Sequence, residues 1–464
     1  MLLRNAEKFD IINLLELEKE DKAENPHLIW RKKVFLEEES MNWKSIMILL
    51  AAVGSLYSLL LGVVRYFSLG NPTPANLRDV YDADTYEKWK KYSKEHARLG
   101  MISSLVSGVI TILLLLTNAY AAFASLFPFT MEWQIFGVIL LETVVDTIVS
   151  VVKSYISTMK IEQKYGFNRS TMKTFVFDKI GGFVLSLGVA FAVSEGIGAA
   201  KDLFGIWMIP AFAVLGFLGS LVISFLYPVF SRIGNKFTPL PEGELRDSLM
   251  KLLKKYGYKV KEIQVMDASR RTTKLNAYFT GFGKLKTIVL YDNLVNAMST
   301  EEITAVFAHE LGHGLHKDIQ KRQVLNIFQL LVMGAVAYYL TSAVDFSDFG
   351  FIYVEGGITY SVINYGMAYV LLGIALSVLQ PILSFIMNAS SRRAEFRADR
   401  QAVIEGYGEA MISAFKKMAR DNFSHLSPSW INVVLEYSHP PLKARIRGVE
   451  RAMKRYGKRA STRK

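Results

Sequence analysis

The 464-residue chain contains no cysteine, which excludes disulfide bonds and thiolate metal sites. Any metal ion must therefore be held by histidine, aspartate or glutamate, and histidine itself is scarce, with 7 residues. The first 44 residues are charged and lack an early apolar core, so they do not show the pattern of a cleavable signal peptide. They are expected to form a polar, amphipathic or partly disordered segment.

Hydrophobic residues make up 51% of the chain and are concentrated in runs, which indicates an integral membrane protein. The formal net charge of +13 could indicate a nucleic-acid ligand, but lysine and arginine also accumulate on the cytoplasmic side of membrane proteins. We therefore expect a lipid bilayer, and no nucleic acid, among the partners. Seven runs are long enough to cross a hydrocarbon core of about 30 Å. They are Ile46–Val64, Met101–Phe123, Trp133–Val152, Ile180–Ile197, Ile206–Tyr227, Val324–Leu340 and Val362–Met387.

The charges between these runs predict the orientation. Basic residues follow the first, third, fifth and seventh runs, and Lys201 is the only one found after the second, fourth and sixth. The positive-inside rule then places the soluble insert, residues 231–322, and the C-terminal segment in the cytoplasm. Basic residues at 31–33 and Lys44 oppose the external N-terminus that this placement requires. The membrane is expected to be a prokaryotic plasma membrane or the endoplasmic reticulum.

An H-E-x-x-H motif lies in the soluble insert, as His309-Glu310-Leu311-Gly312-His313. Four residues, about one helical turn, separate the two histidines, so both imidazoles leave the same face of a helix. Two imidazoles at this spacing can bind one Zn²⁺, and Glu310 can accept a proton from a water molecule that the ion activates. The alternative is a helix with two ordinary surface or core histidines.

The insert also has the local order of a thermolysin-like protease, with strands followed by an active helix. A leucine-rich helix is expected to start near Pro239 and to end at Gly257. Ser299 and Glu302 form a capping box that should begin the motif helix. Strands are expected at residues 260–265, 276–282 and 287–291, the last two joined by a turn at Gly283-Lys284.

Catalytic zinc sites use three protein ligands and keep a fourth position open, so one ligand is still missing. The candidate segment is Ser391–Asp399, into which the seventh run should continue as a helix because no glycine or proline separates them. Glu395 and Asp399 lie four residues apart on one face. Glu395 could complete the zinc coordination, and Asp399 could accept a hydrogen bond from a ligand imidazole. The same spacing also fits an ordinary solvated pair of carboxylates.

The chain resembles the seven-span CAAX prenyl endoproteases, integral-membrane zinc metalloproteases with an E-x-x-x-D third-ligand segment. The resemblance starts near residue 75 and is carried by ordered blocks: Lys164–Asn168, Asn235–Pro241, Asn276–Phe279, the motif helix, Ser391–Asp399 and Tyr437–Pro441. It implies a mainly α multi-pass membrane protein, with seven transmembrane helices around a chamber and a thermolysin-like (gluzincin) zinc protease domain. The expected divisions are a polar segment at 1–44, five spans at 45–230, the protease domain at 231–322, two spans at 323–390 and a C-terminal segment at 391–464.

The resemblance implies that His309, His313 and Glu395 hold one Zn²⁺ per chain. It also implies that Glu310 is the general base and proton shuttle of peptide hydrolysis. The substrate would be a peptide or protein, prenylated or otherwise associated with the membrane.

Further roles follow from the same resemblance. Arg445 would pair with Asp399 or hold substrate. Asn276 and Ala277 would lie on an edge strand that pairs with an extended peptide, unless another part of the chain covers that edge. His439 would donate a hydrogen bond to the oxyanion as the carbonyl is attacked, although a lone histidine before Pro-Pro is otherwise more often structural.

Some residues depart from the family pattern, and others allow two interpretations. Family members tend to carry a histidine where this chain has Asp318, and His316 is given no role. Glu142, Asp146 and Glu195 lie within predicted spans. Because carboxylates inside a membrane rarely face lipid, they indicate either an aqueous cavity or pairing with basic residues of neighbouring helices.

The sequence therefore predicts a membrane-embedded zinc metalloendopeptidase that cleaves near the C-terminus of prenylated or other membrane-associated polypeptides. One alternative is a broad quality-control protease like the HtpX proteins, which have fewer spans. Another is a transporter or other non-catalytic metal-binding membrane protein. Glu310 argues against a non-catalytic site, because a structural metal site needs no base.

Overall fold

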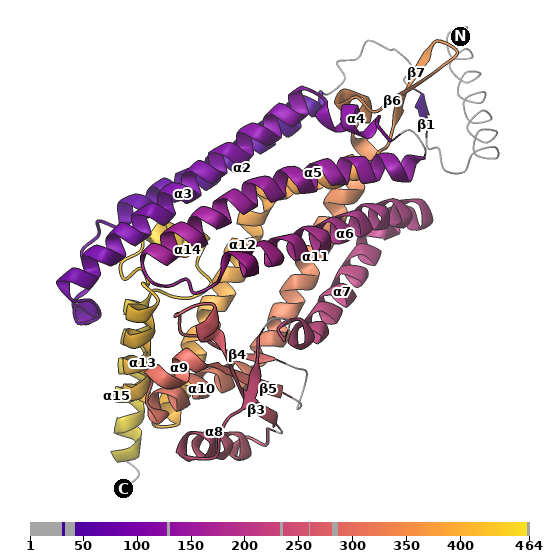
Figure 1. Cartoon of the computed structure of the whole chain (residues 1–464). Helices are drawn as coiled ribbons and strands as arrows, with labels where there is room; N and C mark the ends of the chain where they lie inside the picture. Colours follow the sequence, from indigo (N-terminus) through magenta and orange to yellow (C-terminus); the bar gives the residue numbers. More distant parts are fainter. Residues whose placement is uncertain are drawn as a thin grey trace, which may run out of the picture.

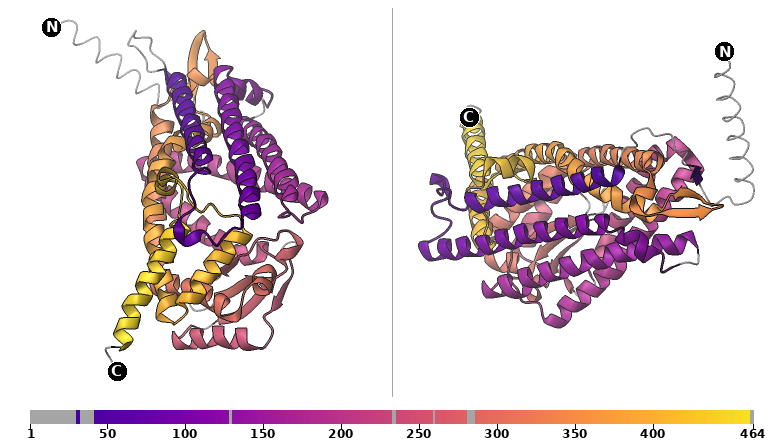
Figure 2. Two further views of the ribbon diagram at one scale, coloured as in Figure 1. Left: turned by 90° about the vertical axis from the view of Figure 1, so that its left-hand side faces the viewer. Right: turned by 90° about the horizontal axis from the view of Figure 1, so that it is seen from above.

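The computed structural model describes residues 30–32, 42–127, 130–232, 235–258, 260–280 and 286–461. Most of the polar segment at 1–44 and the turn predicted at Gly283-Lys284 lie outside these residues. Long helices dominate the described chain and run side by side as a bundle, with a smaller sheet-containing domain at one end (Figures 1 and 2). The long helices are α2 (Trp43–Ser68), α3 (Ala83–Leu116), α5 (Met131–Ser154), α6 (Met172–Phe204), α7 (Met208–Phe230), α11 (Asp318–Ala343) and α12 (Tyr365–Ile404).

Six helical segments of the described chain are long and apolar enough to cross a membrane. One of them, Met172–Ser224, contains α6 and most of α7. Gly205, with φ of +55°, ends α6, and after the short η3 helix α7 leaves in another direction (Figure 1). The six segments therefore overlap all seven runs expected from the sequence.

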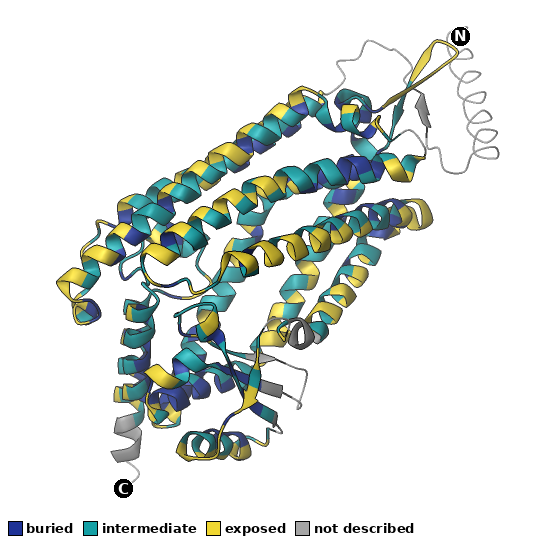
Figure 3. Ribbon diagram, viewed as in Figure 1, coloured by how far each residue is buried: buried dark blue, intermediate teal, exposed yellow. Residues whose placement is uncertain are grey.

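The outward faces of the bundle carry many large apolar side chains, and Figure 3 shows exposed residues along the length of the long helices. An apolar surface of this extent is unfavourable in water, whereas lipid solvates it. The bundle is thus built for a bilayer. Examples from α2, α3, α6 and α7 are Leu49, Leu56, Leu60, Ile102, Leu105, Val184, Leu185, Leu215 and Ile223.

The second span differs from the prediction. Helix α3 ends at Leu116, whereas the apolar run predicted a span that reaches Phe123. Asn118 adopts a left-handed conformation with φ of 53° and separates α3 from the short α4 (Ala119–Ala124). Hydropathy does not detect this break, because the apolar run continues through it. The seventh span also begins later than predicted, at Tyr365, because residues up to Val362 form a hairpin.

The sheet of the smaller domain has the strand order β2-β3-β5-β4. Strands β3 and β5 are parallel, and the other two pairs are antiparallel. The helix predicted to start near Pro239 starts instead at Glu244, because Pro239 belongs to a strand that pairs with β3. The strands are β2 (Phe237–Pro239), β3 (Val260–Met266), β4 (Ala277–Thr280) and β5 (Lys286–Tyr291).

Helices α8 (Glu244–Lys255), α9 (Asp292–Ala297), α10 (Thr300–Leu315), α13 (Gly408–Asp421) and α15 (Leu442–Ser461) share one hydrophobic core with this sheet. At its centre are Leu249, Leu253, Leu294, Ala308 and Val449, none of them exposed by more than 1%. Helix α14 (Trp430–Leu435) precedes α15. At the opposite end of the bundle, β1 (Trp30–Lys32), β7 (Ile358–Val362) and β6 (Ile352–Glu355) form a second sheet (Figure 1). The short helices are η1 (Ala75–Leu77), the π-helical η2 (Tyr155–Glu162), η3 (Gly205–Trp207), η4 (Ala268–Arg270) and η5 (Phe346–Phe349).

Candidate metal centre

Helix α10 carries the two motif histidines. Its first turn is closed by the predicted capping box: the Ser299 N–H donates to the Glu302 carboxylate at 2.8 Å, and the Ser299 hydroxyl accepts from the Glu302 N–H at 3.3 Å. Glu302 also pairs with Lys417 of α13 at 2.7 Å. These contacts fix the position of α10, on which His309 and His313 lie one turn apart.

Helix α12 brings the third side chain. It continues from the membrane bundle to Ile404 without interruption, as the sequence predicted. Glu395 on this helix is 4% exposed, and its carboxylate oxygens lie 3.6 Å from His309 Nε2 and 3.4 Å from His313 Nε2. The close approach of the two helices depends on Gly312, where an added Cβ would lie 2.9 Å from Ala398 Cα.

Each imidazole is oriented by its own carboxylate. Asp399 Oδ1 lies 2.9 Å from His309 Nδ1, and Asp318 Oδ2 lies 3.1 Å from His313 Nδ1. Both rings therefore turn Nε2 toward Glu395. Arg445 in turn grips Asp399 with Nε at 3.0 Å and Nη2 at 2.6 Å.

Sequence reasoning did not assign a role to Asp318 or to Arg397, which pairs with Asp318 at 2.6 Å. Lys317, with φ of 54°, turns the chain between α10 and α11 and so brings Asp318 back to His313. No helical spacing rule relates residues across such a turn. The only signal in the sequence was an acidic residue where the family tends to have a histidine.

Burial and neighbouring charges shift the pKa values of three basic side chains at the site. Burial opposes protonation of His313, but the carboxylates of Glu395 and Asp318 outweigh it and raise the pKa of this imidazole. Burial likewise disfavours the Arg445 charge, but Asp399 outweighs it and raises the pKa of the guanidinium. His439 keeps 58% of its side chain exposed, yet the surrounding atoms desolvate it enough to lower its pKa, which favours the neutral ring.

The donor atoms fit a catalytic zinc ion. His309, His313 and Glu395 each offer one ligand atom, and the three atoms lie within 4.8 Å of one another. Bonds of 2.0–2.2 Å to a tetrahedral zinc would separate such atoms by about 3.4 Å. Oε2 of Glu395 is buried and accepts no hydrogen bond, and it forms an ion pair with Nη2 of Arg445 at 3.2 Å. Two imidazoles and one carboxylate form a known catalytic zinc set.

Glu310 and His439 lie close to these three residues, whereas Asn276 and Ala277 lie at the sheet. Glu310 is half-buried on α10. His439 Nε2 lies 3.9 Å from Glu395 Oε1, on the segment between α14 and α15. Ala277 is the first residue of β4, the edge strand of the sheet, and Asn276 immediately precedes it.

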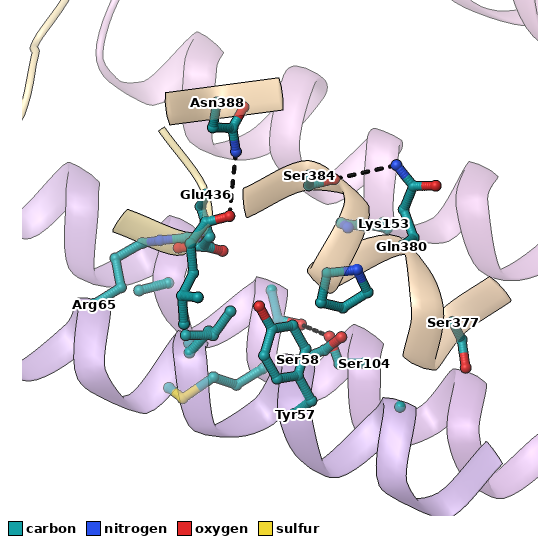
Figure 4. Close-up of a pocket in the computed structure, with 18 residues that line it drawn as sticks. Tyr57, Ser58, Arg65, Ser104, Lys153, Ser377, Gln380, Ser384, Asn388 and Glu436 are labelled. Carbon is teal, nitrogen blue, oxygen red and sulfur yellow. Dashed lines mark hydrogen bonds and ion pairs between the residues drawn. The ribbon is translucent and has the colours of Figure 1, made fainter. Parts of the chain in front are cut away.

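Two adjoining cavities lie inside the bundle. The smaller, of about 610 Å³, lies between α2, α3 and α12 and is shown in Figure 4. The larger, of about 1050 Å³, also reaches α5 and α6, and Lys153 lines both. Glu142 and Asp146 line the larger cavity, and Tyr120 donates a hydrogen bond to Glu142. Glu195 is not among the lining residues.

The two histidines of an H-E-x-x-H helix lie beside a carboxylate from a membrane helix. This combination is typical of a membrane-integral metallopeptidase. Residues 239–453 match the family model of peptidase family M48. Residues 63–232 match that of the CAAX prenyl protease N-terminal region, which has five membrane helices. The chain is 34% identical over 300 residues to the CAAX prenyl protease 1 homolog of Arabidopsis thaliana, covering 64% of this chain and 69% of that protein. It belongs to the CAAX prenyl protease 1 family of M48 peptidases.

Other relatives extend the match over most of the chain. The CAAX prenyl protease 1 of Saccharomyces cerevisiae is 29% identical over 451 residues, covering 90% of this chain and 97% of that protein. The crystal structure of S. mikatae Ste24p superposes with a TM-score of 0.79 at 26% identity, covering 90% of this chain and 100% of that one. The fold class predicted from the sequence is thereby confirmed, and the HtpX-like alternative is not favoured.

Proposed function

We propose that this metallopeptidase is zinc-dependent and hydrolyses peptide bonds near the C-terminus of prenylated polypeptides. The observation that carries the proposal is the meeting of His309, His313 and Glu395, from two helices far apart in sequence, with one ligand atom of each within 4.8 Å of the others. Prenylated substrates are inferred because the relatives are CAAX prenyl proteases. The larger cavity within the helical bundle offers space for a lipid chain.

Zinc bound by the three side chains would supply a Lewis acid that activates water and polarises the scissile carbonyl. Glu310 lies next to His309 on α10 and takes the proton from the attacking water, then delivers it to the departing amine. His439 donates a hydrogen bond to the carbonyl oxygen as negative charge develops on it. Strand β4 is the edge strand of the sheet, along which an extended peptide pairs.

Asp318, Asp399 and Arg445 hold the ligand side chains in place. We also propose that the sheet-containing domain and the C-terminal segment face the cytoplasm, as the distribution of basic residues indicates. The membrane would then be the endoplasmic reticulum or a prokaryotic plasma membrane.

Substrate class can be tested with purified full-length protein in detergent. Farnesylated and unmodified peptides of one sequence are compared, with and without a chelator. We expect cleavage of the farnesylated peptide to be faster, and the chelator to abolish cleavage of both. Equal rates for the two peptides would contradict lipid recognition, and full activity in excess chelator would contradict metal dependence.

The base can be tested by Glu310→Gln, which keeps the shape of the side chain and removes its ability to take a proton. We expect the zinc content to stay at one per chain and kcat to fall by at least about 10²-fold. Zinc content by mass spectrometry and peptide turnover are measured on the same sample. Glu301→Gln, an exposed glutamate in the first turn of the same helix, is the matched control and should keep its activity. Near-normal turnover by Glu310→Gln would rule out the proposed base.

A further inference from the structure

Segment 432–439 comprises the last four residues of α14 and the first four residues that follow it toward α15, and it carries His439. Its backbone is held by side chains of α12. Nη1 of Arg392 donates to the carbonyl oxygens of Val433 at 2.9 Å, Val434 at 3.4 Å and Tyr437 at 2.7 Å. Nδ2 of Asn388 donates to the carbonyl oxygen of Leu435 at 3.2 Å. The last three carbonyls of α14, which a helix end leaves without internal partners, are thus all bound by α12.

The same segment is held from its other side by α2. Asn432, 1% exposed, donates to the carbonyl oxygen of Leu61 at 3.1 Å and to Glu436 at 2.7 Å. The other Glu436 oxygen pairs with Arg65 at 2.5 Å. Figure 4 shows Arg65, Glu436 and Asn388 together at the wall of the smaller cavity. Segment 432–439 is therefore fixed between two membrane helices.

The His439 side chain is 58% exposed, and its polar contacts with the Ser438 hydroxyl at 3.5 Å and with Glu395 at 3.9 Å are both long. Its position is therefore set by its backbone, two residues beyond the Tyr437 carbonyl that Arg392 holds. Arg392 also lies three residues before Glu395, on the same side of α12. One helix thus positions both the carboxylate of the metal centre and the backbone that carries His439.

We propose that Arg392 is a positioning residue for peptide hydrolysis, and that it acts by fixing segment 432–439 so that His439 stays beside the metal centre. Asn388 assists it at Leu435. The proposal rests on the proposed function, because it concerns the histidine that binds the developing oxyanion. A displacement of about 1 Å at such a group can cost about 10²-fold in rate without weakening substrate binding.

The test is a double-mutant cycle in the full-length protein, with Arg392→Gln, His439→Ala and the double variant. For Arg392→Gln we expect kcat to fall by about 10²-fold, with KM and zinc content close to those of the wild type. In the His439→Ala background the same substitution should cost less than about 3-fold, because the group it positions is already gone. Arg393→Gln is the matched control, since Arg393 is the neighbouring arginine of α12 and is exposed.

Several outcomes of the cycle would contradict the proposal. Wild-type kcat for Arg392→Gln would overturn it, and so would an equal fold-loss in both backgrounds. If Arg392→Gln does not yield folded protein, Asn388→Ala removes one anchor only. It should lower kcat by about 10-fold in the wild-type background and have almost no effect beside His439→Ala. Full activity of His439→Ala would overturn the positioning role but not the peptidase assignment, which Glu310→Gln tests separately.

Discussion

Asp399 and Asp318 orient the imidazole rings of the two motif histidines. Asp399 and Asp318 each accept a hydrogen bond from the Nδ1 of one imidazole, which fixes the tautomer with Nε2 free to bind a cation. Each carboxylate is itself paired with an arginine, Arg445 for Asp399 and Arg397 for Asp318. The imidazoles are therefore oriented before any ion arrives.

Replacing Asp318 by asparagine should weaken zinc binding by about 10- to 100-fold, because the amide keeps the shape but loses the charge that makes His313 more basic. Competition with a chelator of known affinity measures this change. Asp247→Asn, at an exposed position of α8, is the control and should bind zinc as tightly as the wild type. An unchanged affinity for Asp318→Asn would show that His313 needs no such support.

At the level of elements, the site depends on how closely α10 packs on α12. Gly312 lies between the two motif histidines and Ala398 lies between Glu395 and the end of α12, so their contact sets the distance between the ligands. A Cβ at position 312 would lie 2.9 Å from Ala398 Cα and 3.0 Å from Gln401 Cβ, and backbone cannot yield as a flexible side chain does.

Gly312→Ala should therefore destabilise the protein by about 1–3 kcal/mol and weaken zinc binding as the helices separate. Thermal unfolding in detergent and zinc titration measure the two effects. Gly188→Ala in α6, where an added Cβ meets no atom within 4 Å, is the matched control and should be neutral or stabilising by up to about 1 kcal/mol. Equal melting temperatures for the two variants would contradict a role for close helix packing.

The comparison of sequence with structure shows which elements local patterns can predict. The motif helix was predictable because its capping box and its i,i+4 histidines are local signals. The continuation of α12 was predictable because no glycine or proline separates the seventh run from Ser391–Asp399. The left-handed turn at Asn118 was not, since its flanks stay apolar. Asp318 and Arg392 were missed for a different reason. Their partners, His313 and the 432–439 backbone, come near them only through tertiary structure.

At the scale of the whole molecule, His425 joins the bundle to the segment that follows α13. Its Nδ1 accepts from the Ser427 N–H at 3.2 Å, so the proton lies on Nε2, which is 2.9 Å from the Ser68 hydroxyl at the end of α2. The Ser68 hydroxyl in turn donates to the Arg65 carbonyl at 2.7 Å. These hydrogen bonds require the neutral form of the His425 imidazole, because Nδ1 must be unprotonated to accept from Ser427. Burial and the nearby Arg65 lower the pKa of His425 to about 4.

A histidine with a lowered pKa in the folded state stabilises the fold only while it is neutral. In the unfolded chain its pKa is about 6.5, so between pH 6.5 and pH 4 the unfolded state binds more protons and stability falls as the pH falls. The loss attributable to His425 is at most about 3 kcal/mol. Melting temperatures at pH 7 and pH 4.5 should differ less for His425→Gln than for the wild type. The same difference in both proteins would show that other groups cause the acid sensitivity.

The length of α12 has a consequence for biosynthesis. One rod of 40 residues crosses the bilayer and then delivers the third cation-binding group to a pair of histidines made some eighty codons earlier. With Glu395 as the proposed third ligand, a ribosome-bound chain that has only just completed the H-E-x-x-H turn would hold an incomplete metal site. The enzyme would then be inactive until α12 has been inserted, and a fragment of residues 231–322 would lack the third ligand.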